Sequence, residues 1–396
     1  MPDDDARLNG DETLTLTVAG GIGEVAAAEW DACAGTANPF VRHAFLHALE
    51  ASGSAVSQRG WLPQHTLVRD GAGRLVGAAP LYLKSHSFGE YVFDWAWADA
   101  YERAGGAYYP KLQAAVPFTP VTGPRLLVRG ELDEATRERV AGALADGLIR
   151  VAQRHEVSSL HVTFPTHAEW SRLGSHGYLR RVGVQYHFAN PGYADFDAFL
   201  AALRAQKRKQ IRRERREVAD SGVVVRRLTG AELAPHHWET FYDFYLCTAD
   251  KRFGFPYLTP DFFERLHATM PEAVVLVMAW RPNGHPVAAA LNIAGADALY
   301  GRIWGCAEEH RFLHFECCYY QAIEHALANG LSRVEAGAQG EHKIPRGYLP
   351  VETYSAHWIA DPRLRAGVAD FIERERPVVR AEKTALADKS PFRAPA

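Results

Sequence analysis

Residues 273–293 read AVVLVMAWRPNGHPVAAALNI, two apolar runs on either side of the turn Pro282-Asn283-Gly284. Asn-Gly supplies the positive φ angles that a tight hairpin needs, so this stretch predicts two antiparallel strands. We expect a further strand, ALYGRIWG, at 298–305. A helix should follow at 313–329, where apolar residues recur at helical spacing, and then a strand, LSRVEAG, at 331–337.

The first half of the chain repeats this order. Residues 64–83 read QHTLVRDGAGRLVGAAPLYL, a second hairpin pattern, and YVFDWAW at 91–97 is expected to be the next strand. A helix at 131–155 and a strand at 158–164 complete the set. Two copies of hairpin, strand, helix and strand predict a mixed α/β protein, α+β in the wider sense, with one sheet in each half.

The two halves are expected to meet near Asp195. We expect an N-terminal domain at 1–195 and a C-terminal domain at 196–384, which begins with a basic helix. Residues 385–396 contain two prolines and short side chains without a periodic apolar face, so we expect a flexible tail there.

Composition limits the class of protein. The 396 residues include 44 Lys and Arg against 47 Asp and Glu, a net charge of −3, which excludes a generally basic nucleic-acid coat protein. No run approaches the ~18 apolar residues of a membrane span, and the N-terminus is acidic. The five cysteines form no CxxC pair. We therefore expect a soluble, cytoplasmic protein without a membrane span.

A strongly basic segment opens the second half. Residues 196–218 read FDAFLAALRAQKRKQIRRERREV, and we expect one uninterrupted helix. Eight Lys and Arg fall within thirteen residues, with Glu214 as the only acid. Because like charges repel, this helix favours an anion such as RNA phosphates, a nucleotide-like acyl carrier or a cell-wall precursor. The alternative is a solvated helix face. The candidate anion-binding residues are Lys207, Arg208, Arg212 and Arg215.

The stretch 335–348, EAGAQGEHKIPRGY, follows a predicted strand, and open α/β sheets place their sites at such strand ends. Amide formation needs a base for the attacking amine, donors for the carbonyl oxygen, and a counter-charge for the leaving group. Glu341 or His342 is the expected base, and a polar surface loop is the alternative. The candidate catalytic residues here are Glu341, His342 and Glu335, and the candidate substrate-binding residues are Lys343, Arg346 and Gln339.

Two further clusters carry candidate residues. At the predicted helix start 313–316, Glu316 is a catalytic candidate and His314 a substrate-binding one, although an acid there also complements the helix dipole. No spacing of His, Cys and acids fits a metal site, so we expect no metal. In the first half, aromatic rings and carboxylates suit a cationic amine or a sugar-peptide ligand. Those candidates are Asp94, Asp99, Tyr101, Tyr108 and Lys111.

Several long strings resemble one bacterial family. They are FDWAWADAY at 93–101, YYPKLQAAVPFTPVTGPRLL at 108–127, KRKQIRRERR at 207–216, LHFECCYYQAIEHA at 313–326 and EAGAQGEHKIPRGY at 335–348. The family is the FemAB-like "peptidoglycan biosynthesis/recognition" group of the GNAT acyltransferase superfamily. The resemblance implies two tandem GNAT-like domains, each a mixed central sheet flanked by helices.

The resemblance also implies a function. It points to an N-acyltransferase or aminoacyltransferase acting on an amine acceptor, such as a peptidoglycan-precursor-like substrate. The donor is either acyl-CoA or aminoacyl-tRNA, with tRNA bound by the basic helix. The loop 306–312 departs from the GNAT pyrophosphate loop, since it lacks glycine and carries Glu308 and Glu309, which disfavours CoA there. The alternative is a non-catalytic protein of this fold that recognises an anionic or cell-wall-type ligand.

Overall fold

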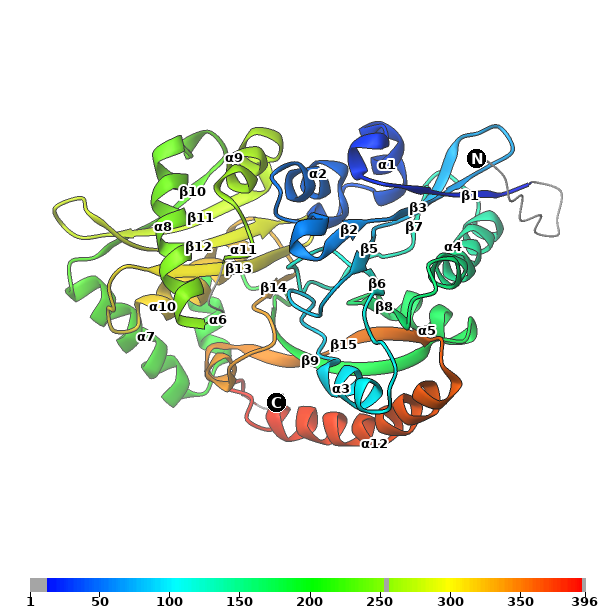
Figure 1. Cartoon of the computed structure of the whole chain (residues 1–396). Coiled ribbons are helices and arrows are strands. Elements are labelled where there is room, and N and C mark those ends of the chain that lie inside the picture. Colours follow the sequence, from blue (N-terminus) through cyan, green and yellow to red (C-terminus); the bar gives the residue numbers. More distant parts are fainter. Residues whose placement is uncertain (1–12, 253–255, 394–396) are drawn as a thin grey trace. The chain divides into compact units, whose positions relative to one another are not determined.

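The computed structural model describes residues 13–252 and 256–393 and divides the chain into two compact units (Figure 1). Unit 1 comprises Met1–Gly183 and Thr353–Val379, and unit 2 comprises Val184–Glu352 and Arg380–Ala396. This partition differs from the expected single boundary at 195/196, because the chain returns to unit 1 near its C-terminus. Strands β9 (Leu179–Ala189) and β15 (Tyr348–Ile359) each run from one unit into the other.

Unit 1 contains a four-stranded sheet in the order β1-β3-β4-β7 and a ladder in the order β9-β15-β8-β6-β5-β2, in which β6 and β8 are parallel. Its elements are β1 (Thr15–Ala19), α1 (Ala27–Ala34), α2 (His43–Ala51), β2 (Trp61–Pro63), β3 (His65–Arg69), β4 (Leu75–Ala79), β5 (Leu81–Lys84), α3 (Trp95–Arg103), β6 (Lys111–Ala114), β7 (Leu127–Val128), α4 (Glu134–Arg154), β8 (Ser159–Thr163) and α5 (His167–Ser175).

Unit 2 contains the ladder β10-β11-β12-β13-β14-β9, in which β13 and β14 are parallel. Its elements are α6 (Phe196–Ala202), α7 (Ala205–Asp220), β10 (Val224–Thr229), α8 (Pro235–Arg252), α9 (Pro260–Thr269), β11 (Val274–Trp280), β12 (Pro286–Ala294), β13 (Ala298–Cys306), α10 (Leu313–Phe315), the π-helical turn Glu316–Tyr320, α11 (Gln321–Ala328), β14 (Arg333–Glu335) and the 3-10 helix η7 (Glu341–Arg346). Helix α12 (Pro362–Ala387) begins in unit 1 and ends in unit 2.

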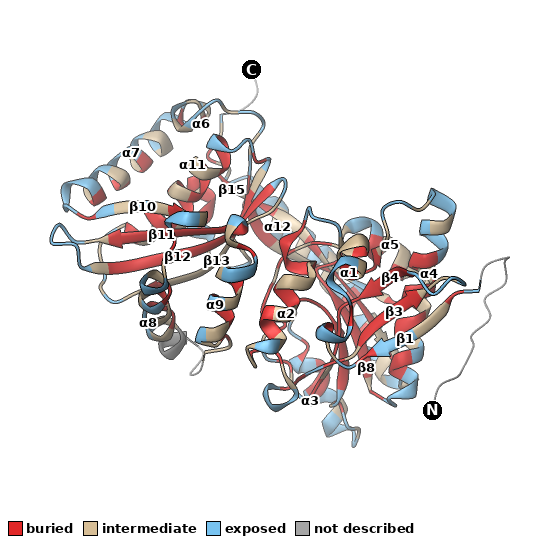
Figure 2. Ribbon diagram, turned by 90° about the horizontal axis from the view of Figure 1, so that it is seen from above, coloured by how far each residue is buried: buried red, intermediate tan, exposed pale blue. Residues whose placement is uncertain are grey.

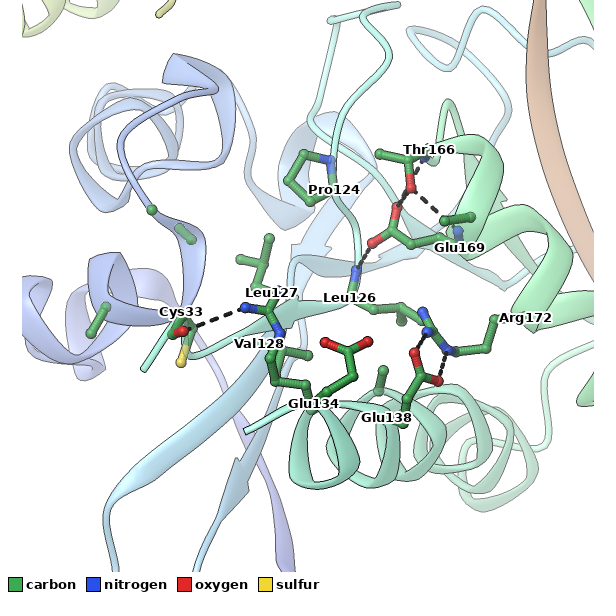
Figure 3. Close-up of a pocket in the computed structure, with 17 residues that line it drawn as sticks. Cys33, Pro124, Leu126, Leu127, Val128, Glu134, Glu138, Thr166, Glu169 and Arg172 are labelled. Carbon is green, nitrogen blue, oxygen red and sulfur yellow. Dashed lines mark hydrogen bonds and ion pairs between the residues drawn. The ribbon is translucent and has the colours of Figure 1, made fainter. Parts of the chain in front are cut away.

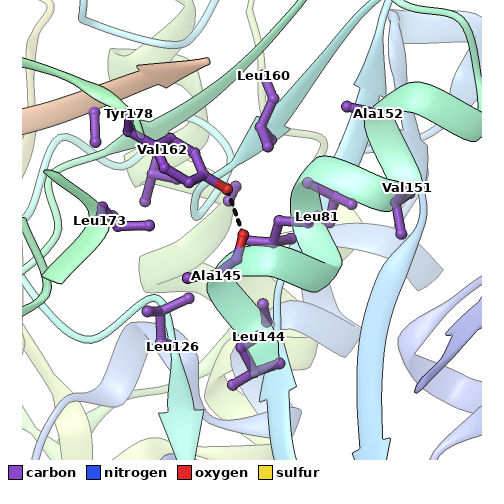
Figure 4. Close-up of a cluster of buried hydrophobic side chains, with 14 of the residues drawn as sticks. Leu81, Leu126, Leu144, Ala145, Val151, Ala152, Leu160, Val162, Leu173 and Tyr178 are labelled. Carbon is purple, nitrogen blue, oxygen red and sulfur yellow. Dashed lines mark hydrogen bonds between the residues drawn. The ribbon is translucent and has the colours of Figure 1, made fainter. Parts of the chain in front are cut away.

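The predicted order of hairpin, strand, helix and strand is present in unit 2, whereas in unit 1 the expected strand at 91–97 is missing. The expectation of one sheet in each half is wrong: β1, β3, β4 and β7 form a four-stranded sheet, and the other strands follow one another in a single eleven-stranded order. The two hairpins, the strand at 298–305 and the two crossover helices form as expected. In unit 1 the apolar side of α4 packs on one face of the sheet, where the Tyr178 hydroxyl donates to the Ala145 carbonyl at 2.8 Å (Figure 4). In unit 2 the buried residues follow β11 and β12 (Figure 2).

The expected strand at 91–97 is wrong, because α3 begins at Trp95. The Asp94 carbonyl accepts the backbone N–H groups of Trp97 and Ala98, which opens a helical turn. Trp97 then packs in a small core with Val368 and Ile372. These partners lie far along the sequence, so the aromatic run by itself does not reveal the helix.

Two further expectations about chain course differ from the structure. The helix expected at 196–218 is interrupted at Leu203, whose backbone is extended and whose buried side chain joins the core of unit 2. Leu203 forms a β-bridge with Phe392, and the Arg204 N–H donates to the Pro391 carbonyl at 2.9 Å. Residues of the expected flexible tail therefore pair with the break between α6 and α7. No helix within the described residues is long and apolar enough to cross a membrane.

Candidate functional site

The short strand β14 pairs with the first residues of β13 over its whole length, and the candidate site lies where β14 ends. The register joins Ala298 to Arg333 and ends at Tyr300 and Glu335, whereas β13 continues to Cys306. A β-bulge also shifts the β12–β13 register between Leu291 and Asn292. Bulges re-aim strand side chains and are frequent beside active sites. The end of β14 is therefore taken as the candidate site.

Glu335 occupies the last position of β14. Its neighbour Val334 lies in the core with α11, so the alternation of a strand puts Glu335 on the opposite face. The side chain is 3% exposed; one carboxylate oxygen accepts from Arg333 at 3.0 Å, and the other, Oε2, has no hydrogen-bond partner in the structure. Burial raises the pKa of Glu335 to about 7, against the opposing effect of Arg333.

Two side chains flank Glu335 in register. Tyr300 on β13 and His187 on β9 are its direct partners on the two neighbouring strands. The His187 Nε2 atom lies 3.7 Å from Glu335 Oε2, and burial lowers the pKa of His187 to about 3, so this imidazole is neutral at pH 7. Burial and the Glu335 carboxylate raise the pKa of Tyr300 above its usual range. A carboxyl that titrates near neutrality, between two uncharged rings, is suited to accept a proton.

The loop after β14 is tied back to the strand end. Gly337 and Gly340 have positive φ angles of 75° and 99°, which L side chains rarely adopt. Lys343 is buried and donates to the carbonyls of Ala336, at 2.5 Å, and Gly337, at 3.3 Å. The expected role of Lys343 as a holder of a substrate anion therefore differs from its position, in which it holds the loop.

Arg346 is also buried and engaged inside unit 2. Its guanidinium donates to Glu214 Oε1 on α7 at 2.8 Å and to the His342 carbonyl at 2.5 Å, and it lies 3.4 Å above the ring of Phe315. The hydroxyl of Tyr320 donates to the other oxygen of Glu214. Arg346 thus fixes η7 against α7 rather than facing solvent to bind a ligand.

The two residues expected to supply the base lie at the surface. Glu341 is 62% exposed and pairs with Lys389 at 2.7 Å. His342 is exposed, and its Nε2 lies 2.9 Å from the Tyr319 hydroxyl. The ring of His314 lies 5.3 Å from that of Tyr319 and 6.1 Å from that of His342. His314, His342 and Tyr319 therefore form one aromatic group, while Glu341 is directed to Lys389. Gln339 is exposed.

Glu316 lies in the π-helical turn and is bound on two sides. Arg215 donates to both of its carboxylate oxygens, at 2.9 and 3.0 Å, and Gln321 donates at 2.7 Å. Arg215 also pairs with Glu324 at 2.5 Å. These ion pairs leave Glu316 as a structural partner rather than a base, and they withdraw Arg215 from the expected anion-binding face of α7.

The outer face of α7 is exposed (Figure 2), and the sequence gives it Lys and Arg side chains. Lys209, Arg212, Arg213 and Arg216 are exposed, and Lys207 and Arg208 are half-buried. Arg212 makes a surface ion pair with Asp197 at 3.3 Å, which is weak because both side chains are largely exposed. Of the four expected anion-binding residues, Lys207, Arg208 and Arg212 thus keep a side chain near solvent, whereas Arg215 is held by Glu316 and Glu324.

Three of the expected substrate-binding residues of unit 1 form a buried cluster. Lys111 donates to Glu90 at 2.7 Å and also binds Asp94, and the Tyr108 hydroxyl donates to Asp94 at 2.7 Å. Tyr101 is half-buried and donates to Asp361 at 3.4 Å. Asp99, by contrast, is exposed and pairs with Arg103 on the surface of α3, so it does not join the cluster.

Unit 1 also contains a pocket of about 520 Å³, shown in Figure 3. Two of its lining carboxylates are engaged: Glu138 binds Arg172, and Glu169 accepts the backbone N–H groups of Arg125 and Leu126 at 2.8 and 2.7 Å. A third, Glu134, is exposed. Burial raises the pKa of the Cys33 thiol to about 11, so it is not a nucleophile at neutral pH. Among its described lining residues, none combines burial with a free carboxylate oxygen as Glu335 does.

The sequence did not identify Glu214, Lys84 or Glu90 as site residues. Glu214 pairs with Arg346 across 132 positions, and its only signal is its place as the single acid in the basic run. Lys84 ends an apolar strand, LYLK, where an inward charge breaks the pattern. Glu90 carries no local signal.

The sequence of this chain matches a known protein family. A family model described as peptidoglycan biosynthesis/recognition, FemAB-like, matches residues 21–394. The chain is structurally similar to FemX, with 12% identity, a TM-score of 0.55, and coverage of 87% of this chain and 98% of that one. No curated protein sequence matches the chain significantly.

A second solved structure has a similar fold. It is the C-terminal domain of a putative lysylphosphatidylglycerol synthetase from Agrobacterium fabrum, with 9% identity and a TM-score of 0.53. The match covers 88% of this chain and 95% of that one. At these identities the likeness shows the fold alone.

Proposed function

The chain belongs to the FemAB-like family, and we propose that it is a transferase that moves an acyl or aminoacyl group onto an amine. The observation that carries this proposal is the Glu335 carboxyl, buried at the end of β14 with a pKa near 7 and one oxygen without a partner. The family description and the FemX-like fold support a peptidoglycan-precursor-like acceptor.

The proposed reaction starts with the acceptor amine in its protonated form. Glu335 takes one proton, and the amine nitrogen then attacks the carbonyl carbon of the donor ester or thioester. A C–N bond forms and the bond to the leaving oxygen or sulfur breaks. The nitrogen then loses its second proton, the leaving oxygen or sulfur gains one, and Glu335 releases the proton it took to solvent. A base with a pKa near 7 suits this task, because it is substantially ionised at pH 7 and still basic enough to accept a proton.

The donor is held, in this proposal, by the exposed cations of α7. Acyl-CoA and aminoacyl-tRNA both carry phosphates, and the basic face suits either. In the loop before α10, Glu308 pairs with Arg281 at 2.6 Å and with His310 at 3.2 Å, and an acid at that position disfavours a pyrophosphate. This loop chemistry supports aminoacyl-tRNA over acyl-CoA.

The test compares Glu335→Gln with Glu341→Gln, a matched control that removes an exposed carboxylate six residues away. Transfer of a labelled aminoacyl group, or of labelled acetyl from acetyl-CoA, to a lysine-containing peptidoglycan precursor is measured. We expect Glu335→Gln to lose about 100- to 10,000-fold in rate and Glu341→Gln to stay within about threefold. Equal rates for both variants would exclude Glu335 as the base. An inactive wild-type protein that still binds the precursor would instead support a non-catalytic binding protein.

A further inference from the structure

One face of the sheet in unit 1 carries two buried ammonium groups. Lys84 on β5 and Lys111 on β6 are direct partners in antiparallel register, so their side chains leave the same face of the sheet. Both are fully buried. Two like charges side by side in the interior repel strongly, so this face requires negative charge from elsewhere.

That negative charge comes from a single segment, residues 85–94, which connects β5 to α3. Glu90 lies between the two lysines, with Oε2 2.7 Å from Lys111 Nζ and Oε1 3.9 Å from Lys84 Nζ. Asp94 also binds Lys111, and the Ser87 hydroxyl accepts a hydrogen bond from Lys111 Nζ at 2.7 Å. The Phe88 carbonyl accepts from Lys84 at 3.2 Å. The segment thus covers both lysines.

The burial of side chains in this segment is the reverse of that in an ordinary loop, in which aromatic side chains are buried and acids are exposed. Its acids Glu90 and Asp94 are buried, whereas Phe88 and Phe93, together with Trp95 at the start of α3, are 46%, 56% and 49% exposed. Burying an aromatic side chain stabilises a fold by roughly 1.5–3 kcal/mol, and a buried ion pair adds little net stability. The docked arrangement therefore gives up apolar burial in order to place two carboxylates on the lysines.

Both carboxylates are only half satisfied. Glu90 Oε1 and Asp94 Oδ1 are buried and have no hydrogen-bond partner in the structure. Buried polar atoms in a purely structural ion pair are normally all bonded, and each exception needs an explanation. Protein carboxylates that occupy the binding positions of a ligand's carboxylates would make fewer hydrogen bonds there than the ligand itself.

We propose that residues 85–94 form a lid over a second ligand site, in which Glu90 and Asp94 occupy the places of two carboxylates of a bound ligand on Lys84 and Lys111. The ligand class is a small molecule or peptide with two carboxylates. When it binds, the segment leaves the sheet face, and the hydroxyl of Tyr108, now bonded to Asp94, becomes available to the ligand. This site is independent of the transfer chemistry at Glu335.

The first experiment uses the wild-type protein with glutarate as the dicarboxylate probe. A lysine-acetylating reagent is added under native conditions, and modification is read residue by residue by mass spectrometry. Both amines are buried in the docked arrangement, so the reagent reaches them only when the segment opens. We expect Lys84 and Lys111 to react by lid opening, and saturating glutarate to slow both at least tenfold. The exposed Lys389, which lies outside both proposed sites, should react equally with and without glutarate.

The second experiment removes the internal competitor with the double variant Glu90→Gln/Asp94→Asn. We expect it to bind glutarate at least tenfold more tightly than the wild-type protein, and the added substitution Lys111→Met to abolish binding. Modification of both lysines only at the rate of global unfolding, with or without glutarate, would overturn the lid. Protection by inorganic phosphate but not by glutarate would overturn the dicarboxylate assignment.

Discussion

Two buried glutamates, Glu90 in unit 1 and Glu335 in unit 2, have pKa values raised to about 7 by burial, but their surroundings differ. Glu335 belongs to a strand that is hydrogen-bonded to β13 on one side and β9 on the other, so its position is fixed by the sheet. Glu90 belongs to a connecting segment and is held mainly by Lys111. The same pKa therefore accompanies a fixed base in one unit and a removable counter-ion in the other.

The largest expected effect is on the free energy of unfolding. It distinguishes the Arg346–Glu214 ion pair, which is fixed in the fold, from the ion pairs of Lys111, which lid opening can break. Arg346→Met leaves Glu214 buried and unpaired on α7, and breaking such a pair costs about 3–5 kcal/mol of unfolding free energy. Lys111→Met should cost less than about 2 kcal/mol, because the lid can carry Glu90 and Asp94 into water. Denaturant unfolding of the two variants measures both values. A larger loss for Lys111→Met would contradict the lid.

The next prediction concerns the pH dependence of transfer. Only ionised Glu335 accepts a proton, and its pKa is about 7, so the rate should rise with pH and level off above about 7. Between pH 7 and pH 5 the rate should fall by roughly 50- to 100-fold, as the ionised fraction falls. A pH–rate profile at saturating substrate measures this. A rate that stays level down to pH 5 would assign the base to a group with an ordinary carboxyl pKa.

A smaller effect is expected from the surface of α7. The triple variant Lys209→Gln, Arg212→Gln and Arg216→Gln should weaken tRNA binding about 10- to 30-fold at low salt and less at high salt, because phosphate contacts are screened. The control carries Arg137→Gln, Arg150→Gln and Arg154→Gln on α4, which remove the same charge from unit 1. Filter binding across salt concentrations compares them. Equal affinities would mean that α7 is only a solvated face.

The smallest expected effect tests the exposed aromatic ring of Trp95, which directly follows the lid at the start of α3. Trp95→Ala should change the unfolding free energy by less than about 0.5 kcal/mol, because the side chain is half exposed. Trp97→Ala, two residues further in the same helix, should cost about 3–5 kcal/mol, since its ring is buried. Thermal unfolding measures both. A large loss for Trp95→Ala would show that the ring supports the docked segment.

The sequence predicted the order of elements because the signals for hairpins and helices are local. The turn at 282–284 joins two neighbouring strands, and the apolar spacing of 313–329 runs along consecutive helical turns, so neither signal needs a distant partner. The errors came from tertiary contacts: α3 starts at Trp95 because Asp94 is held by Lys111, and the break at Leu203 is paired by Phe392. Such contacts leave no periodic trace in either segment.

The candidate site was predicted in part. The stretch 335–348 was identified because a strand end followed by glycines is a local pattern, and Glu335 was included as a strand-borne acid. Sequence reasoning preferred Glu341 and His342 as the base, because it has no measure of burial. The structure shows that Glu341 pairs with Lys389 at the surface, whereas Glu335 is desolvated. A sequence shows which residues are acids, but the desolvation of a carboxyl depends on the whole fold.

The central claim, that Glu335 is a base poised near neutral pH, has a direct test that needs no substrate. Glutamate carboxyl carbons of the wild-type protein and of Glu335→Gln are followed by carbon-13 NMR between pH 3 and pH 9. The account predicts one resonance that titrates near pH 7 and is absent from Glu335→Gln. Because Glu90 is also raised to about 7, Glu90→Gln assigns the second such resonance. A Glu335 resonance that titrates near the ordinary value of about 4.3 would contradict the account.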